Sequence, residues 1–151
     1  MKALAIMHHD VVEEDLESSG FSGAGANVYK LERADFARHL DAIGEAAGAG
    51  QLQTIEGWAD WGNRQPVLLT FDDGGVSAHG IIASMLEERG WRGHFFIATD
   101  WIGRPGFLDE AQMSANRAEA LERFANGGET LAEILHANTG VQQYARVSRG
   151  H

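Results

Sequence analysis

Three short apolar runs, separated by segments of helical periodicity, constrain most strongly what this chain can fold into. The runs are residues 2–7, 66–71 and 93–99. Residues 31–47 and 76–89 lie between them and repeat apolar side chains at the spacing of a helix with one buried face. The order strand, helix, strand, helix, strand is typical of a parallel sheet with crossover helices. The sequence therefore predicts the α/β class.

The same pattern predicts which side chains form the core. Those expected to be buried together are Leu68, Phe71, Ile81, Leu86, Phe95 and Ile97. Residues 13–29 are polar and glycine-rich, so we expect a loop there. Asp109 and Glu110 are expected to begin a further helix, because acidic side chains are favourable in a first turn. At 151 residues the chain is long enough for one domain with a sizeable core.

The stretch "PVLLTFDDGG", residues 66–75, places Asp72 and Asp73 side by side at the end of the second apolar run. Adjacent carboxylates repel each other and burial disfavours them further, so the pair needs a reason. In α/β folds the chemistry lies at the carboxyl ends of the strands. Consecutive strand side chains point to opposite sides, so one carboxylate can bind a divalent metal while the other accepts a proton from metal-bound water. A solvated Asp–Gly turn is the other interpretation, and these residues alone leave it open.

Four stretches of the chain together resemble one protein family. They are "AIMHHDV", "LLTFDDGG", "IIASMLEERGWRGHFFIATDWIG" and "FLDEAQM". These stretches, within residues 1–113, resemble the polysaccharide deacetylases, the NodB-homology group of carbohydrate esterases. The resemblance implies a partial (β/α) barrel that hydrolyses acetyl groups from an acetylated carbohydrate with a divalent metal, usually zinc. Carried over by position, Asp72 is the implied catalytic base and Asp73 the implied metal ligand.

The second metal-binding motif that the resemblance implies has no counterpart in this sequence. That motif, His-Ser/Thr-x-x-His, is expected soon after "FLDEAQM". Residues 114–140 contain only His136, which has no histidine four positions away on either side. We therefore expect residues 114–151 to form a divergent helical tail and the metal site to be incomplete. A truncated or frameshifted deacetylase with impaired activity is the expected product.

Trp101 and His9 are the candidate substrate-binding residues. Trp101 follows the third apolar run and His9 follows the first, so both are expected at the edge of the sheet where the Asp pair lies. Trp101 is the best candidate among the four tryptophans to line a sugar groove, although large aromatic side chains are more often core residues. His8 or His9 is an alternative source of the missing metal ligand, although a His–Asp sequence after a strand is as often a structural turn.

Composition excludes several classes of partner. The net charge of −10 argues against nucleic acid or an anionic membrane surface as the main partner. The chain has no cysteine, which excludes disulfides and thiolate metal sites. No apolar segment reaches the length of a membrane span, so we expect a cytoplasmic protein. No pattern in the sequence indicates an oligomeric state.

Two other functions fit parts of the sequence. A response-regulator-like phosphoacceptor domain also holds a metal with acidic residues at strand ends, but it needs a lysine after them. The only lysines here, Lys2 and Lys30, precede the Asp pair. The second alternative is a non-catalytic remnant that keeps a carbohydrate contact, which explains the absent histidine pair directly. Metal content and hydrolytic turnover separate this remnant from an active enzyme.

Overall fold

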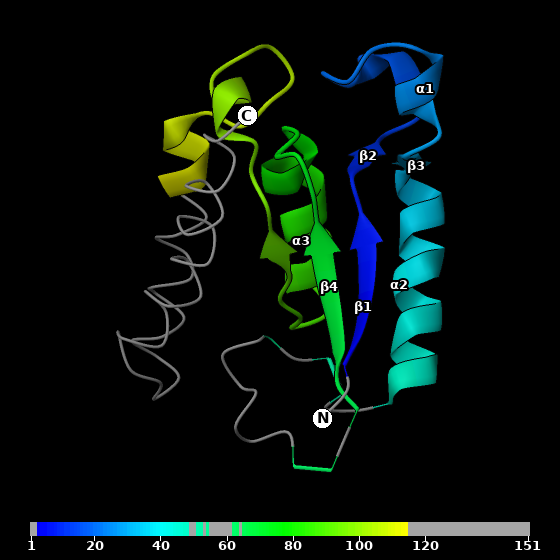
Figure 1. The fold of residues 1–151 in the computed structure, drawn as a ribbon. Helices are drawn as coiled ribbons and strands as arrows, with labels where there is room; N and C mark the ends of the chain where they lie inside the picture. Colours follow the sequence, from blue (N-terminus) through cyan, green and yellow to red (C-terminus); the bar gives the residue numbers. More distant parts are fainter. Residues whose placement is uncertain (1–2, 49–50, 53, 55–61, 64, 115–151) are drawn as a thin grey trace.

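The computed structural model describes residues 3–48, 51–52, 54, 62–63 and 65–114, and its fold is α/β (Figure 1). The elements in chain order are β1 (Leu4–His8), β2 (Asp10–Val12), η1 (Leu16–Ser18), α1 (Ala24–Asn27), β3 (Lys30–Glu32), α2 (Arg33–Ala47), β4 (Val67–Phe71), η3 (Ala78–Ile82), α3 (Ala83–Glu87), β5 (His94–Phe95) and η4 (Thr99–Trp101). The predicted tail beyond residue 114, and Trp58 and Trp61, lie outside the described residues. In the part that is described, no helix is long and apolar enough to cross a membrane.

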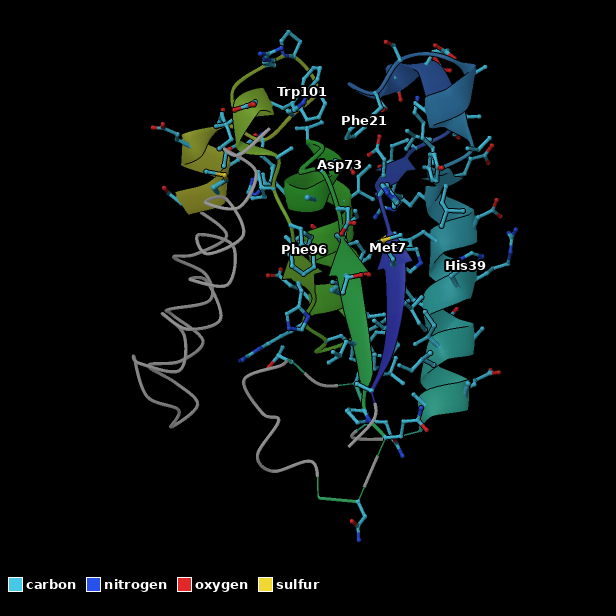
Figure 2. The ribbon with its side chains drawn as sticks, in the orientation of Figure 1. Met7, Phe21, His39, Asp73, Phe96 and Trp101 are labelled. Atoms are coloured by element: carbon cyan, nitrogen blue, oxygen red, sulfur yellow. The ribbon has the colours of Figure 1, made fainter. Side chains whose placement is uncertain are left out.

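The main sheet has three parallel strands in the order β1, β4, β5. Its register aligns Leu4 with Val67 and His8 with Phe71, and Phe71 is aligned on the other side with Phe95. β4 is therefore the middle strand, which is why its sequence is an uninterrupted apolar run. The side chain of Met7 on β1 is exposed to solvent (Figure 2). The third apolar run forms a shorter strand than expected, because only His94 and Phe95 join the ladder.

The segment predicted as a loop, residues 13–29, contains two short helices, η1 and α1, so that prediction is wrong. It is bordered by β2 and β3, which pair in parallel as a second sheet. The buried amino group of Lys30 donates hydrogen bonds to the Leu16 carbonyl and, at 2.7 Å, to Asn27 Oδ1. These hydrogen bonds satisfy a buried charge and hold the two short helices together. Polar contacts of this kind leave no apolar periodicity in the sequence.

The helices predicted on either side of β4 are both present. Residues 31–47 were expected to be helical, and α2 occupies Arg33–Ala47. The helix that follows the Asp pair begins as a π-helix, η3, and continues as the α-helix α3. The Ala83 amide donates to the Ala78 carbonyl, five residues back, where an α-helix would use the carbonyl four residues back. The helix expected from Asp109–Glu110 is also present, with its first helical residue at 110.

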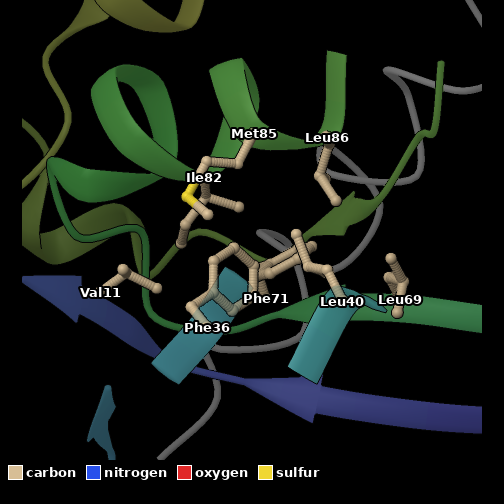
Figure 3. Packing of buried hydrophobic residues seen from close by; sticks show 8 residues of the cluster. All are labelled: Val11, Phe36, Leu40, Leu69, Phe71, Ile82, Met85 and Leu86. Atoms are coloured by element: carbon tan, nitrogen blue, oxygen red, sulfur yellow. The ribbon is translucent and has the colours of Figure 1, made fainter. Parts of the chain in front are cut away.

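The core lies between α2, α3 and one face of the main sheet (Figure 3). Its buried members are Val11, Phe36, Leu40, Leu69, Phe71, Ile82, Met85 and Leu86. Phe71 and Leu86 were predicted, whereas Ile81 and Phe95 are half-buried against this cluster and Leu68 is buried outside it. Leu69 and Phe71 share one face of β4 because strand side chains alternate, and Leu68 points to the other face. Burying a large apolar side chain contributes about 1.5–3 kcal/mol, so this cluster holds both helices on the sheet.

Candidate active site at the carboxyl end of the sheet

Asp72 and Asp73 lie where β4 ends and the chain turns toward η3 (Figure 2). The Asp72 amide donates a 3.0 Å hydrogen bond to the His8 carbonyl at the end of β1. The Asp73 carbonyl accepts a 3.3 Å hydrogen bond from the Ala98 amide, which follows β5. The backbone of the pair is thus held from both neighbouring strands. Its position at the carboxyl end of a parallel sheet is the one that the sequence predicts.

Asp73 adopts a left-handed backbone conformation, with φ of 71°. Among the described residues it is the only non-glycine residue with positive φ, a conformation that costs an ordinary residue about 1–2 kcal/mol. Such strain is concentrated at functional sites, where the surrounding structure enforces it. The next two positions require glycine because there is no room for a side chain. A Cβ at Gly74 would lie 2.8 Å from Ile97 Cγ2, and one at Gly75 would lie 2.7 Å from Phe21 Cε2.

The two carboxylates differ in their surroundings. Asp73 is exposed, whereas Asp72 is half-buried. Burial raises the pKa of Asp72, the nearby positive charge of His9 opposes that rise, and the negative charge of Asp73 adds to it. A carboxylate with a raised pKa is a better proton acceptor than an ordinary surface aspartate. The environment therefore places a half-buried carboxylate with a raised pKa next to an exposed carboxylate.

His9 directly follows His8, whose carbonyl accepts the hydrogen bond from the Asp72 amide, and the charge of His9 partly offsets the rise that burial causes in the pKa of Asp72. Its half-buried ring contacts the ring of Tyr29, with the ring centroids 4.9 Å apart. Tyr29 is 59% exposed. Nothing in the sequence marked Tyr29, because it lies in the polar segment before β3 and belongs to no periodic pattern. The structure therefore adds an aromatic side chain to the His9 side of the site.

His8 points into the core. It is buried, stacks on Phe71 with 5.6 Å between ring centroids, and meets the edge of Phe36 at 5.2 Å. Its Nδ1 has no hydrogen-bond partner among the described residues. Burial, followed by the charges of His39 and His9, lowers the pKa of His8 to about 4. His8 is therefore a neutral core side chain, and it contributes to the site through the backbone carbonyl that holds Asp72.

Trp101 lies at the same end of the molecule as Asp73 (Figure 2). It is 45% exposed, and its ring stacks on Phe107 with 4.9 Å between centroids. The Arg104 guanidinium lies 4.6 Å from the centroid of the Trp101 ring, a cation–π contact. Phe107 in turn meets Phe21, with 4.7 Å between ring centroids. These contacts fix the segment between Trp101 and Phe107 near the carboxyl end of the sheet, and they cover part of the Trp101 ring.

Asp10 is a buried acidic residue near the pair, and its role could not be predicted from the sequence. Its Oδ1 accepts hydrogen bonds from the Val11 amide at 2.9 Å and from the Ser77 hydroxyl at 2.5 Å. Both Asp10 and Ser77 are buried. They tie β2 to the residue that precedes η3, which fixes the far side of the turn that carries Asp73. The only sequence signal was an acidic residue directly after "HH".

The described residues do not complete a metal site. Within them, no group of three or more His, Cys, Asp or Glu side chains is placed to hold a metal ion. A zinc site needs three protein ligands in one small volume, and a single exposed carboxylate such as that of Asp73 binds zinc weakly. The residues that the structure describes therefore do not fit the zinc site that the sequence resemblance implies.

The structure thus has an acidic pair at the carboxyl end of the middle strand of a parallel sheet, with the crossover helices α2 and α3 packed on one face. The sequence model of the polysaccharide deacetylase family matches residues 60–137, more than half of the chain. The chain belongs to this family. The match begins before β4 and continues past residue 113, and the division of the chain at that residue stays a prediction. No curated protein sequence matches the chain.

Solved structures of deacetylases share the fold. IcaB from Ammonifex degensii is 23% identical, with a TM-score of 0.58 over 80% of this chain and 50% of its own. A polysaccharide deacetylase from Bacillus cereus is 17% identical, with a TM-score of 0.61 over 93% of this chain and 48% of its own. The Streptococcus pyogenes deacetylase PplD, solved with acetate, is 16% identical, with a TM-score of 0.57 over 78% and 53%. The chain thus spans about half the length of these relatives, and its fold is a partial barrel of the polysaccharide deacetylase type.

Proposed function

We propose that this chain carries the acidic half of a metal-dependent site that hydrolyses acetyl groups from an acetylated carbohydrate. The observation that supports this most strongly is the Asp72–Asp73 pair. It lies at the carboxyl end of β4 with Asp73 held in a strained conformation, and it lies within the residues that match the family. The relative from Streptococcus pyogenes was solved in complex with acetate, which is the product this reaction would release.

The two carboxylates take different roles in this proposal. Asp72 is the proton acceptor, because its pKa is raised and its backbone is fixed by the His8 carbonyl. Asp73 would offer an exposed carboxylate oxygen to a divalent cation; the resemblance implies zinc, for which the described residues supply only part of a ligand set. A metal would polarise the acetyl carbonyl and activate water. His9 and Trp101 border the site and are proposed to contact the carbohydrate.

We further propose that turnover by this chain is weak. The only histidines in the sequence after residue 113 are His136 and His151, and they are not spaced as a metal-binding pair. With one carboxylate and few neighbouring ligands, metal affinity falls steeply. The alternative, a non-catalytic remnant that contacts carbohydrate, is favoured by the same observation and differs in having no turnover at all.

Acetate release separates these functions. Purified protein is incubated with acetylated chitooligosaccharides or acetylated xylan, with and without added Zn²⁺ or Co²⁺, and its metal content is measured by elemental analysis. We expect well under one equivalent of metal and at most trace acetate release, which Asp72→Asn removes. Complete absence of release would favour the remnant. Stoichiometric metal with rapid turnover that Asp73→Ala abolishes would contradict the proposed impairment and would require ligands from elsewhere.

A further inference from the structure

Tyr29 is an exposed aromatic side chain at the carboxyl end of the sheet. It lies between α1 and β3, which Figure 1 shows beyond the carboxyl end of β1. Its amide donates a 3.0 Å hydrogen bond to the Ala26 carbonyl, so its backbone is fixed to α1. More than half of its surface nevertheless remains in contact with water. Exposed aromatic side chains beside a polar site often mark a surface that binds something else.

His9 connects Tyr29 to the acidic pair. The rings of His9 and Tyr29 are 4.9 Å apart between centroids and inclined by 42°. His9 is adjacent in sequence to His8, whose carbonyl accepts the Asp72 amide. The charge of His9 also acts on the Asp72 carboxylate, so the imidazole lies within electrostatic reach of that group. Tyr29 therefore contacts the histidine whose charge acts on the proposed proton acceptor.

Trp101, the aromatic residue that the sequence favoured for sugar contact, is more heavily engaged. Its ring contacts both Phe107 and the Arg104 guanidinium. Among the described residues, the ring contact of Tyr29 is with His9 alone. Of these two aromatic side chains at this end of the sheet, Tyr29 is the more exposed, at 59% against 45% for Trp101.

We infer that Tyr29 is a carbohydrate-contacting residue, whose ring packs against a sugar unit next to the one that presents its acetyl group to Asp72. This inference rests on the proposed function. An aromatic ring suits the role because it packs against the apolar C–H face of a sugar ring. The phenolic hydroxyl can also donate or accept a hydrogen bond with sugar hydroxyls. The expected ligand class is therefore an acetylated oligosaccharide of two or more units.

Binding of penta-N-acetylchitopentaose, measured by isothermal titration calorimetry, tests this role without requiring turnover. Tyr29→Ala is expected to weaken binding roughly tenfold, the size of effect typical of one aromatic contact. Tyr29→Phe keeps the ring and should remain within about threefold of the unsubstituted chain. Val28→Ala is the matched control, because Val28 is the neighbouring residue and is 75% exposed. It should leave binding unchanged. Thermal unfolding by circular dichroism verifies that all variants are folded.

The outcomes separate this inference from the function on which it rests. Binding that Tyr29→Ala leaves unchanged, in a chain that binds the oligosaccharide, would overturn the role of Tyr29 and leave the proposed function intact. Equal loss in Tyr29→Phe and Tyr29→Ala would overturn packing of the ring. No binding by the unsubstituted chain, to this oligosaccharide or to acetylated xylan, would reject the proposed carbohydrate function together with the inference.

Discussion

His8 makes the stability of this protein depend on pH, and replacing it with phenylalanine should remove that dependence. The imidazole is buried between Phe36 and Phe71, and its Nδ1 lacks a hydrogen-bond partner among the described residues. Burial is the main reason that its pKa falls from the usual 6.5 to about 4. A phenyl ring in its place keeps the aromatic contacts and cannot be protonated. His8→Phe thus removes the titratable group together with the unpaired Nδ1, and only the loss of the titratable group makes its effect depend on pH.

The sign and size of the effect follow from the two pKa values. Because the folded protein disfavours the charged imidazole, the unfolded chain binds the proton more readily, and acid favours unfolding. The full stability is present above pH 6.5 and is lost progressively as the pH falls toward 4. Each pKa unit corresponds to about 1.4 kcal/mol, so the whole loss reaches about 3 kcal/mol. By about pH 5 the His8 contribution to that loss is about 2 kcal/mol.

Urea unfolding of the unsubstituted chain and of His8→Phe, at about pH 7.5 and about pH 5, measures this contribution. Other acid-sensitive groups are common to both proteins and cancel in the comparison. We expect His8→Phe to be at least as stable at the higher pH, since no unpaired Nδ1 remains, and to gain about 2 kcal/mol more over the unsubstituted chain at the lower pH. If both proteins lose the same free energy of unfolding between the two pH values, His8 is not a buried neutral imidazole.

Four further substitutions test the geometry of the site and the core, each by the free energy of unfolding in urea. Asp73→Gly should stabilise the fold by about 0.5–1 kcal/mol, because glycine adopts the left-handed conformation at no steric cost, and it should remove any bound metal. A loss of stability would mean that the carboxylate makes a stabilising contact. Phe71→Ala should cost about 3–5 kcal/mol and Phe95→Ala about 1–3 kcal/mol, since Phe95 is only half-buried; the reverse order would contradict the placement of β5 at an edge of the described sheet. Gly93→Ala should destabilise by about 1–3 kcal/mol, because its Cβ would lie 2.5 Å from Phe71 Cε2; a neutral result would show that the Phe71 ring moves freely.

The parts of the fold that could be predicted are those with apolar periodicity. β1, β4 and α2 lie where the pattern places them, because burial of one face leaves a regular trace in the sequence. The two short helices in residues 13–29 depend on hydrogen bonds to the Lys30 amino group, and such contacts have no period. The third strand lies within its predicted run, but its short length could not be predicted, because residues 96–99 are as apolar as the strand and continue outside it as a half-buried segment.

The candidate site shows the same division. The Asp pair could be located from sequence because it directly follows an apolar run and is followed by two glycines. The left-handed conformation of Asp73 could not be predicted, because an Asp–Gly sequence is the same whether the backbone of the aspartate is strained or relaxed. Tyr29 comes to the site through the pairing of β2 with β3, and Asp10 is joined to it by the hydrogen bond from Ser77; both are contacts between segments that local sequence does not reveal.

The π-helix after the Asp pair means that this segment tolerates a change of residue type better than a change of length. A π turn holds one residue more than an α-helix would use over the same stretch, so η3 has the form of a one-residue insertion. Deleting a residue from Ala78–Ile82 would let the helix close in the regular way. Everything before it would then rotate by about 100° relative to Met85 and Leu86. Met85 and Leu86 are buried in the core, so they would keep their positions, and Ser77 and the turn that contains Asp73 would rotate instead. The helix would gain regular hydrogen bonds, but the two carboxylates would point in another direction.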